Sequence, residues 1–427
     1  MADSPLGRVR WVLVFWLFVL GAVSFLDRVN ISVAGMALAQ EYHLSQVRLG
    51  TIFSAFLIGY ALFQTPGGWL ADKFGPRYVL TIGVAWWGIF TAMTASLPSQ
   101  IAGALTYLIL IRLLLGAGEA IIYPASNRFV SQWIPSQERG LANGLIFAGV
   151  GAGTAIAPVF VTYLMIHYGW RSSFWASAIL GLIVGTAWYV FARDTPEEHS
   201  LVSAAELSYI QKFRTTKSDS TTESSRVGWL QIACNRNVLA VTASYFCFGY
   251  VAWIFFSWFY IYLAKVRGLD LKTSALYSTL PPIAIVICSL GGGVISDSLT
   301  KRYGKRIGRC GVACVALFMA AIILIVGSRV ANAPLASVVL SAGAGALYIA
   351  QSSYWSITAD IGSKSSGLVS GFMNMGGQFG GALTASLTPV IAQHYGWTSS
   401  FLAAAILSGL GGLAWLLVDP NRSLAEA

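Results

Sequence analysis

Charged residues are scarce in this chain. Of its 427 residues only 10% are Asp, Glu, Lys or Arg, whereas a soluble domain averages about 25%. Hydrophobic residues make up 56%, so the chain could not cover a water-facing surface. This excludes an ordinary cytosolic enzyme, a disordered protein and a nucleic-acid binder. At about 20 apolar residues per bilayer crossing, the length predicts an all-α membrane protein with about twelve transmembrane helices.

Cysteine pairs and metal motifs are also missing. The five cysteines are an odd number without a C-x-x-C pair, which argues against a disulfide framework and a zinc site. An intramembrane enzyme would need a nucleophile with its base, or a metal set such as H-E-x-x-H, and neither occurs. We therefore expect no enzymatic activity, no catalytic residue, no metal and no cofactor.

Long apolar runs fill the chain instead, too uniform for the alternating strands of a membrane barrel. The first run follows Arg8 and Arg10 and could pass for a signal peptide. It has no convincing cleavage site, so we interpret it as a retained span. The predicted spans are 10–34, 47–69, 78–97, 101–124, 140–166, 172–192, 238–263, 274–296, 308–328, 334–358, 366–393 and 398–418.

Lys and Arg are distributed unevenly between the two sides of the membrane. The side of the N-terminus holds 19, the other side 6, and two lie inside helices, which accounts for all 27. Because cytoplasmic loops carry the excess, both termini are predicted to be cytoplasmic, in the cell inner (plasma) membrane. The asymmetry also explains most of the net charge of +10. Little positive charge then remains that would require nucleic-acid binding as an explanation.

A polar segment divides the chain into two related halves. We expect a cytoplasmic loop at 194–237 between an N-terminal six-helix half, 1–193, and a C-terminal six-helix half, 238–427. The sequence YGWRSSF at 168–174 recurs as YGWTSSF at 395–401. Earlier landmarks also recur in order: Gly67, Gly68, Asp72 and Arg77 return as Gly292, Gly293, Asp297 and Arg302. Parallel six-helix repeats are typical of a transporter whose site lies between them.

The repeated segment after the second span, GWLADKFGPR, resembles the signature of the major facilitator superfamily, and the later copy resembles its weaker repeat. The resemblance predicts a gating latch formed by Asp72, Arg77, Asp297 and Arg302. In it, Asp72 and Asp297 accept hydrogen bonds from helix N-termini and basic residues of the neighbouring half. The alternative is that all four are solvated turn residues.

Only four ionisable acids and bases lie inside the predicted spans away from their ends: Asp27, Arg28, Arg112 and Glu119. All belong to the N-terminal half. A charge at mid-membrane costs about 3 kcal/mol or more, so these residues need a wet cavity and partners. Arg112 and Glu119 are seven residues apart and share one helix face, roughly 10 Å apart along the axis.

Two arginines and two carboxylates suit the coupled binding of an organic anion and protons. Guanidinium forks bind carboxylates bidentately, and buried carboxylates can take up and release protons. An anion at Arg28 or Arg112 would compete with the carboxylates for a guanidinium, so protonation and anion binding favour each other. The alternative is a buried ion-pair network that fixes the first span against the fourth.

Three segments resemble the anion:cation symporter family, which includes bacterial galactonate and glucarate carriers, sialin and the vesicular glutamate carriers. They are 25–34, 60–68 and 112–128, and the resemblance extends over all twelve predicted helices. It implies that Arg28 binds the substrate carboxylate, that Asp27 and Glu119 handle the proton, and that Arg112 tunes Glu119.

Further residues are expected to line the substrate cavity. Tyr60 and Gln64 lie one turn apart on the second span, although helix packing is an alternative for both. In the second half the resemblance implies Tyr354, Trp355, Asn374 and Gln378. Three positions depart from known members: Val150 stands where the galactonate carrier has a glutamine, Tyr260 stands in place of a familiar proline, and Phe53 stands where the vesicular glutamate carriers have a histidine. Galactonate is therefore doubtful and vesicular glutamate is not expected.

The sequence thus predicts a monomeric, proton-coupled symporter that imports an organic carboxylate by alternating access, with a sugar acid as the leading candidate. Its expected partners are a small organic anion, protons and the lipid bilayer, and no nucleic acid. An anion exchanger and a carrier of aromatic acids or dicarboxylates remain alternatives of the same fold. A transporter-like membrane sensor is a further alternative from another class.

Overall fold

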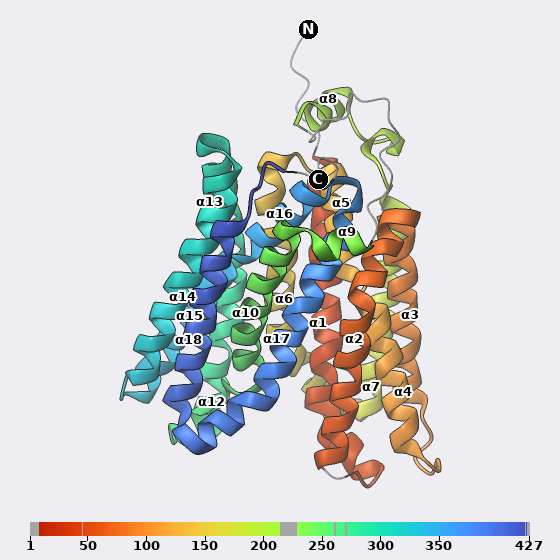
Figure 1. The fold of residues 1–427 in the computed structure, drawn as a ribbon. Helices are drawn as coiled ribbons and strands as arrows, with labels where there is room; N and C mark the ends of the chain where they lie inside the picture. Colours follow the sequence, from red (N-terminus) through yellow and green to blue (C-terminus); the bar gives the residue numbers. More distant parts are fainter. Residues whose placement is uncertain are drawn as a thin grey trace.

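The structure is a computed structural model that describes residues 8–44, 46–213, 229–259, 262–269, 271–422 and 424. Every regular element in these ranges is helical. Figure 1 shows two neighbouring bundles, with the N-terminal half in red to yellow and the C-terminal half in green to blue. The all-α fold predicted from the sequence is confirmed. The Ser/Thr-rich stretch of the central loop lies outside the described residues.

The N-terminal half contains six long spans. Its elements are α1 (Val9–Glu41), α2 (Gln46–Phe74), α3 (Pro76–Ser96), α4 (Ala104–Glu119), α5 (Ile122–Trp133), the 3₁₀ turn Ser136–Glu138, α6 (Arg139–Tyr168) and α7 (Trp170–Phe191).

The C-terminal half repeats this plan with two short π-helical segments. Its elements are α10 (Arg236–Ser257), the π segment Tyr262–Val266, α12 (Leu271–Ser278), α13 (Leu280–Tyr303), the π segment Arg306–Gly311, α14 (Val312–Arg329), α15 (Ala333–Ile349), α16 (Gln351–Gly362), α17 (Ser366–Tyr395) and α18 (Trp397–Ala414).

The described residues contain eleven stretches long and apolar enough to cross a membrane. One of them, Ala333–Tyr395, is 63 residues long and includes α15, α16 and α17. At 1.5 Å per residue a single crossing needs only about 20 residues. This stretch therefore contains the two spans predicted at 334–358 and 366–393, and the total agrees with the predicted twelve.

The fourth span is longer than predicted and is broken. It runs as Ala104–Trp133, with α4 ending at Glu119 and α5 beginning at Ile122. Pro124 lacks an N–H, so the carbonyl of Ala120 has no helical partner and the helix is interrupted there. The prediction of one helix over 101–124 was wrong in this respect.

Glycines let the two halves approach closely. The halves meet where α6 packs along α13 and α2 packs along α17. A Cβ added at Gly68 would collide with the backbone of Gly367, and one added at Gly293 with the backbone of Gly140. Only glycine allows backbones so near one another, so these repeated glycines fix the distance between the halves.

Part of the central loop is folded against the N-terminal half, which its polar composition did not indicate. The helix α8 (Ala204–Phe213) lies beyond the ends of the spans (Figure 1). Its Glu206 is fully buried and accepts from the backbone N–H groups of Val9 and Arg10 at 3.3 Å and from the Arg10 guanidinium at 3.0 Å. This carboxylate satisfies two orphan donors at the start of α1.

The same cluster includes Tyr209 of α8, whose hydroxyl donates to Glu138 at 2.7 Å. Burial, with this carboxylate accepting from the phenol, raises the pKa of Tyr209 to about 12. The phenol is therefore neutral at ordinary pH and stays a donor. Two further short elements complete the loop: the 3₁₀ turn Pro196–Glu198 and α9 (Trp229–Cys234).

Candidate functional site

A cavity of about 800 Å³ lies between the two halves. Its lining residues come from α1, α2, α4, α5 and α6 on one side and from α10, α13, α15, α16 and α17 on the other. Much of the wall is aromatic, including Phe25, Phe56, Phe147, Phe248 and Trp253. This volume accommodates a small organic molecule.

Arg28 lies in the cavity wall, as predicted, and it makes the one ion pair found among the four intramembrane charges of the described residues. Its Nε contacts Glu119 Oε2 at 2.6 Å. The guanidinium also lies 4.1 Å from the ring centroid of Tyr60 and 4.6 Å from that of Phe25. Its Nη2 is buried and has no hydrogen-bond partner among the described residues, so this donor is not used within the described structure.

The two carboxylates lie behind the cavity wall and are fully buried. Glu119 ends α4 and accepts from Ser24 at 3.3 Å in addition to Arg28. Asp27 accepts from Thr91 of α3 at 2.8 Å. Within the described residues, each carboxylate keeps one buried oxygen that has no hydrogen-bond partner. Buried oxygens of this kind can accept a proton with little rearrangement.

Arg112 also lines the cavity, but it does not pair directly with Glu119. Its Nε and Nη1 are buried and find no hydrogen-bond partner in the described part of the chain. About 10 Å separates the two residues along the helix, and Arg28 from α1 occupies the position beside the glutamate. Arg112 therefore lies free beside Phe56, whose ring centroid is 5.0 Å from its guanidinium carbon and 5.4 Å from that of Arg28.

Amides of the C-terminal half face these arginines across the cavity. Asn374 and Gln378 of α17 line it, together with Gln351 of α16. Asn374 Nδ2 donates to Gln64 Oε1 at 2.9 Å. This hydrogen bond joins the two halves, and Gln64 itself lies behind the lining residues.

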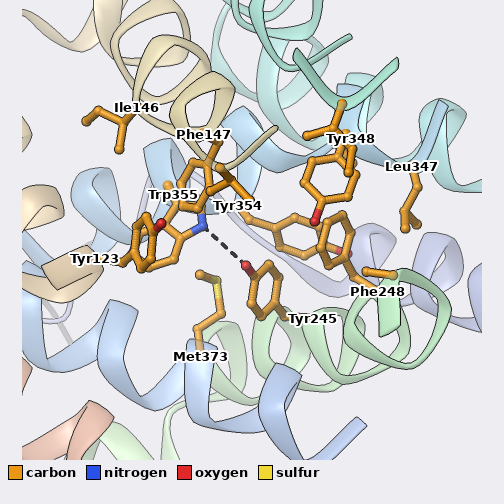
Figure 2. Packing of buried hydrophobic residues seen from close by; sticks show 14 of the residues in the cluster. Tyr123, Ile146, Phe147, Tyr245, Phe248, Leu347, Tyr348, Tyr354, Trp355 and Met373 are labelled. Carbon is orange, nitrogen blue, oxygen red and sulfur yellow. Dashed lines mark hydrogen bonds between the residues drawn. The ribbon is translucent and has the colours of Figure 1, made fainter. Parts of the chain in front are cut away.

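Tyr354 and Trp355 do not line the cavity, contrary to the prediction. Figure 2 shows both in a buried aromatic cluster, where Trp355 Nε1 donates to the Tyr245 hydroxyl at 3.4 Å. Tyr354 pairs with Ser244 at 2.6 Å. Since Tyr245 does line the cavity, the two predicted residues orient a lining residue.

Two of the three positions that depart from known family members lie in the cavity wall, and the third, Tyr260, lies outside the described residues. Val150 of α6 and Phe53 of α2 are lining residues. Each replaces a polar group with an apolar one. On the N-terminal side the lining residues that can form hydrogen bonds through their side chains are Arg28, Arg112, Tyr60, Tyr123, Ser32 and Thr154.

Asp72 joins the halves at the side of the membrane where α1 begins. Its carboxylate accepts from the backbone N–H groups of Gly367 and Leu368, at 3.0 and 2.7 Å, in the first turn of α17. Arg128 lies 3.5 Å from the same carboxylate and donates to the Ser363 carbonyl of the other half at 2.9 Å. A carboxylate at a helix N-terminus is stabilised by the orphan donors there.

Asp297 makes the matching contact in the opposite direction. It accepts from the N–H groups of Gly140 and Leu141 at 2.8 and 2.6 Å, in the first turn of α6. Arg309 lies 2.8 Å from this carboxylate and donates to the Ser136 carbonyl of the N-terminal half at 2.6 Å. The arginines at both junctions belong to the same half as their aspartate, not to the neighbouring half as expected.

The other two predicted latch residues have partners only in their own half among the described residues. Arg77 donates through its backbone N–H to Asp194 at 2.8 Å and through Nε to the Tyr189 carbonyl at 3.0 Å. Arg302 lies exposed, with its guanidinium carbon 5.3 Å from the Tyr303 ring centroid. The basic groups at the junction are thus Arg128 and Arg309, and the repeat did not single them out.

The halves are closed together on this side and the cavity lies beyond the closure. A further ion pair, Arg139 with Asp360, crosses between the halves here. Asn374 lines the cavity at this end, and Gln64 lies behind it, joined by their hydrogen bond. The lining continues away from this end, through Tyr60 to Phe53 on α2. The structure therefore represents a conformation sealed at the end that carries the start of α1.

Comparisons with known proteins agree with this architecture. Residues 17–385 match the model of the Major Facilitator Superfamily. The chain is 34% identical over 400 residues to a probable sulfoacetate transporter of Cupriavidus necator, covering 93% of this chain and 91% of the relative. It is 29% identical to a probable galactarate/D-glucarate transporter of Bacillus subtilis, covering 97% and 92%.

A solved structure of a proton:xylose symporter superposes with a TM-score of 0.79 at 15% identity, covering 98% of both chains. The chain therefore belongs to the major facilitator superfamily and is a multi-pass membrane transporter. The resemblance to the sugar-acid carriers of the anion:cation symporter type is confirmed by its relatives.

Proposed function

We propose that this transporter is a proton-coupled symporter that imports an organic carboxylate, with sugar acids as the leading class, by alternating access. The observation that carries the proposal is the pair formed by Arg28 and Glu119. Arg28 is a cavity-lining cation whose charge is neutralised at 2.6 Å by a fully buried carboxylate. Protonation of that carboxylate would release the guanidinium to an incoming anion.

The coupling follows from competition for one guanidinium. A substrate carboxylate that binds Arg28 replaces Glu119 as the partner of the guanidinium. A protonated, neutral Glu119 no longer competes for Arg28 and no longer repels the substrate anion. Each ligand therefore raises the affinity for the other, and the coupling is reciprocal. Asp27, bonded to Thr91 at 2.8 Å, is the second proton site of this scheme. Arg112, without a partner for Nε and Nη1, supplies a second cation beside the substrate.

The opposite wall suits a hydroxylated substrate body. Asn374, Gln378 and Gln351 line it, and carboxamides both donate to and accept from hydroxyl groups. An acid group at the arginines and hydroxyls at the amides would orient a sugar acid across the cavity. The relatives named above for sulfoacetate and galactarate/D-glucarate support an organic acid as the substrate.

Reorientation requires the contacts of Asp72 and Asp297 to break. In this scheme both termini are cytoplasmic, so the sealed side is the cytoplasmic one and the cavity is ready to receive substrate from outside. Two charge-assisted junctions hold this conformation, and each is worth about 1.5–3 kcal/mol. Binding of substrate and proton would have to offset that energy.

Uptake into proteoliposomes under an imposed pH gradient tests the function. A panel of aldonates, aldarates, uronates, aromatic acids and amino acids should reveal accumulation of one class, abolished by a protonophore. Accumulation that is indifferent to the gradient but strongly stimulated by internal substrate would indicate an exchanger. Absence of uptake for every acid, with a correctly folded protein, would contradict the proposal.

A second candidate substrate class is favoured by the aromatic walls. Phe25, Phe56 and Phe147 line the cavity near the arginines, and Phe53 and Val150 replace polar groups of other family members. An aromatic carboxylate would stack against these rings while its acid group meets Arg28. If the transporter accumulates aromatic acids in preference to sugar acids in the same panel, the aromatic class is the substrate. The proposed coupling of the anion to protons would stay the same.

A further inference from the structure

A second hollow, of about 510 Å³, lies in the C-terminal half at the end where α10 begins. It is separate from the central cavity and shares no lining residue with it. Three arginines line it, Arg236, Arg306 and Arg422, with one acid, Asp419. The side chains in this hollow thus carry two net positive charges.

The hollow lies at the edge of the membrane. Arg236 and Arg306 are the first residues of two candidate spans, and Leu417 is the last residue of a third. Three helices thus begin or end around one pocket. Phospholipid head groups occupy this depth, just outside the hydrocarbon region.

The arginines are available to a ligand. Arg422 contacts Asp419 at 3.6 Å, but both are exposed, and such a pair is weak. Arg236 and Arg306 have no ion pair among the described residues. The N-terminus of α10 does not need a ligand, because the Asn235 side chain accepts from its first N–H groups at 3.0 and 3.2 Å.

The backbone around the hollow is fixed. Asn237 donates to the carbonyl of Asp419 at 3.0 Å, and the N–H of Asp419 donates back to Asn237 at 2.9 Å. This two-way bond ties the start of α10 to the segment after α18. The hollow is therefore built by packed elements and does not depend on a single loop.

Apolar side chains extend from the hollow across the outer surface. Leu416 and Leu417 line it and are 62% and 53% exposed. Leu239, one turn along α10 from Arg236, is 46% exposed. A small water-soluble anion would gain no binding energy from these apolar side chains, whereas the acyl chains of a lipid would cover them.

We propose that this hollow binds the phosphate group of an anionic phospholipid, with its acyl chains along the exposed leucines. Guanidinium groups bind phosphate oxygens bidentately, and basic pockets between transmembrane helices suit anionic head groups. The lipid would bridge the start of α10, the π segment Arg306–Gly311 and the segment that follows α18, at one membrane surface. The inference does not depend on the identity of the transported substrate.

The test is native mass spectrometry of the purified full-length chain titrated with phosphatidylglycerol. Each Arg near a membrane surface contributes about 1 kcal/mol, roughly fivefold in affinity. Arg306→Gln alone should weaken the tightest site about fivefold. The triple variant of Arg236, Arg306 and Arg422 to Gln should weaken it about a hundredfold, unless the three effects overlap.

A matched control removes the same charge elsewhere. Lys73, Lys301 and Arg302 are exposed basic residues at the same end of the spans, outside the hollow. Their triple change to Gln should leave the tightest phosphatidylglycerol site within about twofold. Equal weakening in this control would overturn the proposal, because it would show diffuse attraction by net charge.

Two further probes distinguish the source of the phosphate. Inorganic phosphate at the same concentration should not compete with phosphatidylglycerol, and zwitterionic phosphatidylcholine should bind far more weakly. Full competition by inorganic phosphate would overturn the lipid in favour of a soluble anion. If the triple variant does not fold, Arg306→Gln against Lys301→Gln gives the same comparison with one charge each.

Discussion

In the N-terminal half, α1 and α4 carry four ionisable side chains into the bilayer, whereas the C-terminal wall of the cavity presents amides and aromatic rings. Arg28 and Arg112 face Asn374 and Gln378 across the same space. The two halves descend from one repeat, so this difference is not a consequence of the fold. In the proposed scheme, coupling chemistry therefore needs only one half, while the other recognises the rest of the ligand.

The junction between the halves differs from the cavity in this respect, because both halves contribute the same kind of contact to it. Asp72 caps the first turn of α17, and Asp297 caps the first turn of α6. Each junction is braced by an arginine, Arg128 or Arg309. In the proposed scheme, the contacts that open and close are present in both copies, and the contacts that define the ligand are not.

The largest expected effect is that of Glu119→Gln, which tests whether coupling resides in the N-terminal half. The amide imitates a permanently protonated carboxyl and removes the negative charge 2.6 Å from Arg28. If Glu119 must release its proton for the empty carrier to reset, proton-driven accumulation should fall to the level of empty liposomes. Counterflow should persist, because the loaded carrier can reorient without deprotonation.

Paired uptake and counterflow measurements on the purified variant decide this prediction. Asn374→Ala in the C-terminal half is the comparison, since it should weaken substrate binding without removing coupling to the gradient. Asp27→Asn should also impair accumulation, and the two acids can titrate as a coupled pair. Accumulation at the wild-type level in Glu119→Gln would leave this residue as a structural partner of Arg28.

Arg28→Lys should have the next largest effect. The charge is kept, but an ammonium lacks the planar fork that binds a carboxylate and lies over the Tyr60 ring at 4.1 Å. Substrate affinity should fall about ten- to a hundredfold, corresponding to about 1.5–3 kcal/mol. Binding to the purified protein measures it, with Arg171→Lys, outside the cavity, as the control. Unchanged affinity would move the anion site to Arg112.

The junction should show a smaller effect, in the same direction for both of its aspartates. Asp72→Asn and Asp297→Asn each remove a charged acceptor from a helix N-terminus, so the sealed conformation should lose about 1–3 kcal/mol. Asp297→Asn should cost more, because Arg309 is fully buried and is left without its counter-charge. Labelling of a cysteine placed at Gln378, from the sealed side, should rise tenfold or more.

Arg302→Gln is the control for these variants. The repeat singled out Arg302 as a latch residue, but its side chain is exposed beside Tyr303. Its replacement should leave the labelling unchanged. A rise equal to that of Asp72→Asn would return Arg302 to the junction.

The sequence was sufficient for the fold, and it singled out the four charged residues inside the spans. Apolar runs and a repeat identify spans and halves, because the bilayer penalises every other arrangement. Asp27, Arg28, Arg112 and Glu119 stand out since a charge inside a span is costly. The ion pair of Glu119 with Arg28 was not predicted. Helical spacing gives the relative positions of residues on one helix, but it does not tell which residue of a neighbouring helix lies beside them.

Neutral residues were harder to predict. Tyr245 and Gln351 line the cavity, yet tyrosine and glutamine occur elsewhere in the spans without a distinguishing signal. Trp355 was chosen by resemblance and lies one layer behind Tyr245. Arg128 and Arg309 make equivalent junction contacts from positions that are not equivalent in the repeat. This equivalence exists only in the three-dimensional structure, so a search for residues that recur at a fixed sequence offset does not find it.

The smallest predicted effect concerns the one charged difference within the repeated YGW segment, where Arg171 in the N-terminal half corresponds to Thr398. Arg171 contacts Glu41 at 2.6 Å and the Leu97 carbonyl at 2.9 Å. We call these contacts of Arg171 the clasp; they lie at the other end of the spans from the junction. Arg171→Thr, which copies the C-terminal residue, should destabilise the protein by about 1 kcal/mol or less, because both partners are partly exposed. Thermal unfolding in detergent measures this loss.

The pH dependence separates the ion pair from the rest of the clasp. The hydrogen bond from Arg171 lowers the pKa of Glu41 below its usual range. A carboxyl whose pKa is lower in the folded state stabilises the protein above its unfolded pKa, about 4.3, and this contribution is lost as the pH falls through the folded value. The difference between wild type and Arg171→Thr should therefore be largest near pH 7 and shrink below pH of about 4. In a double-mutant cycle with Glu41→Gln, a coupling energy that stays constant over this range would show that the backbone carbonyls, and not the carboxylate, hold Arg171 in place.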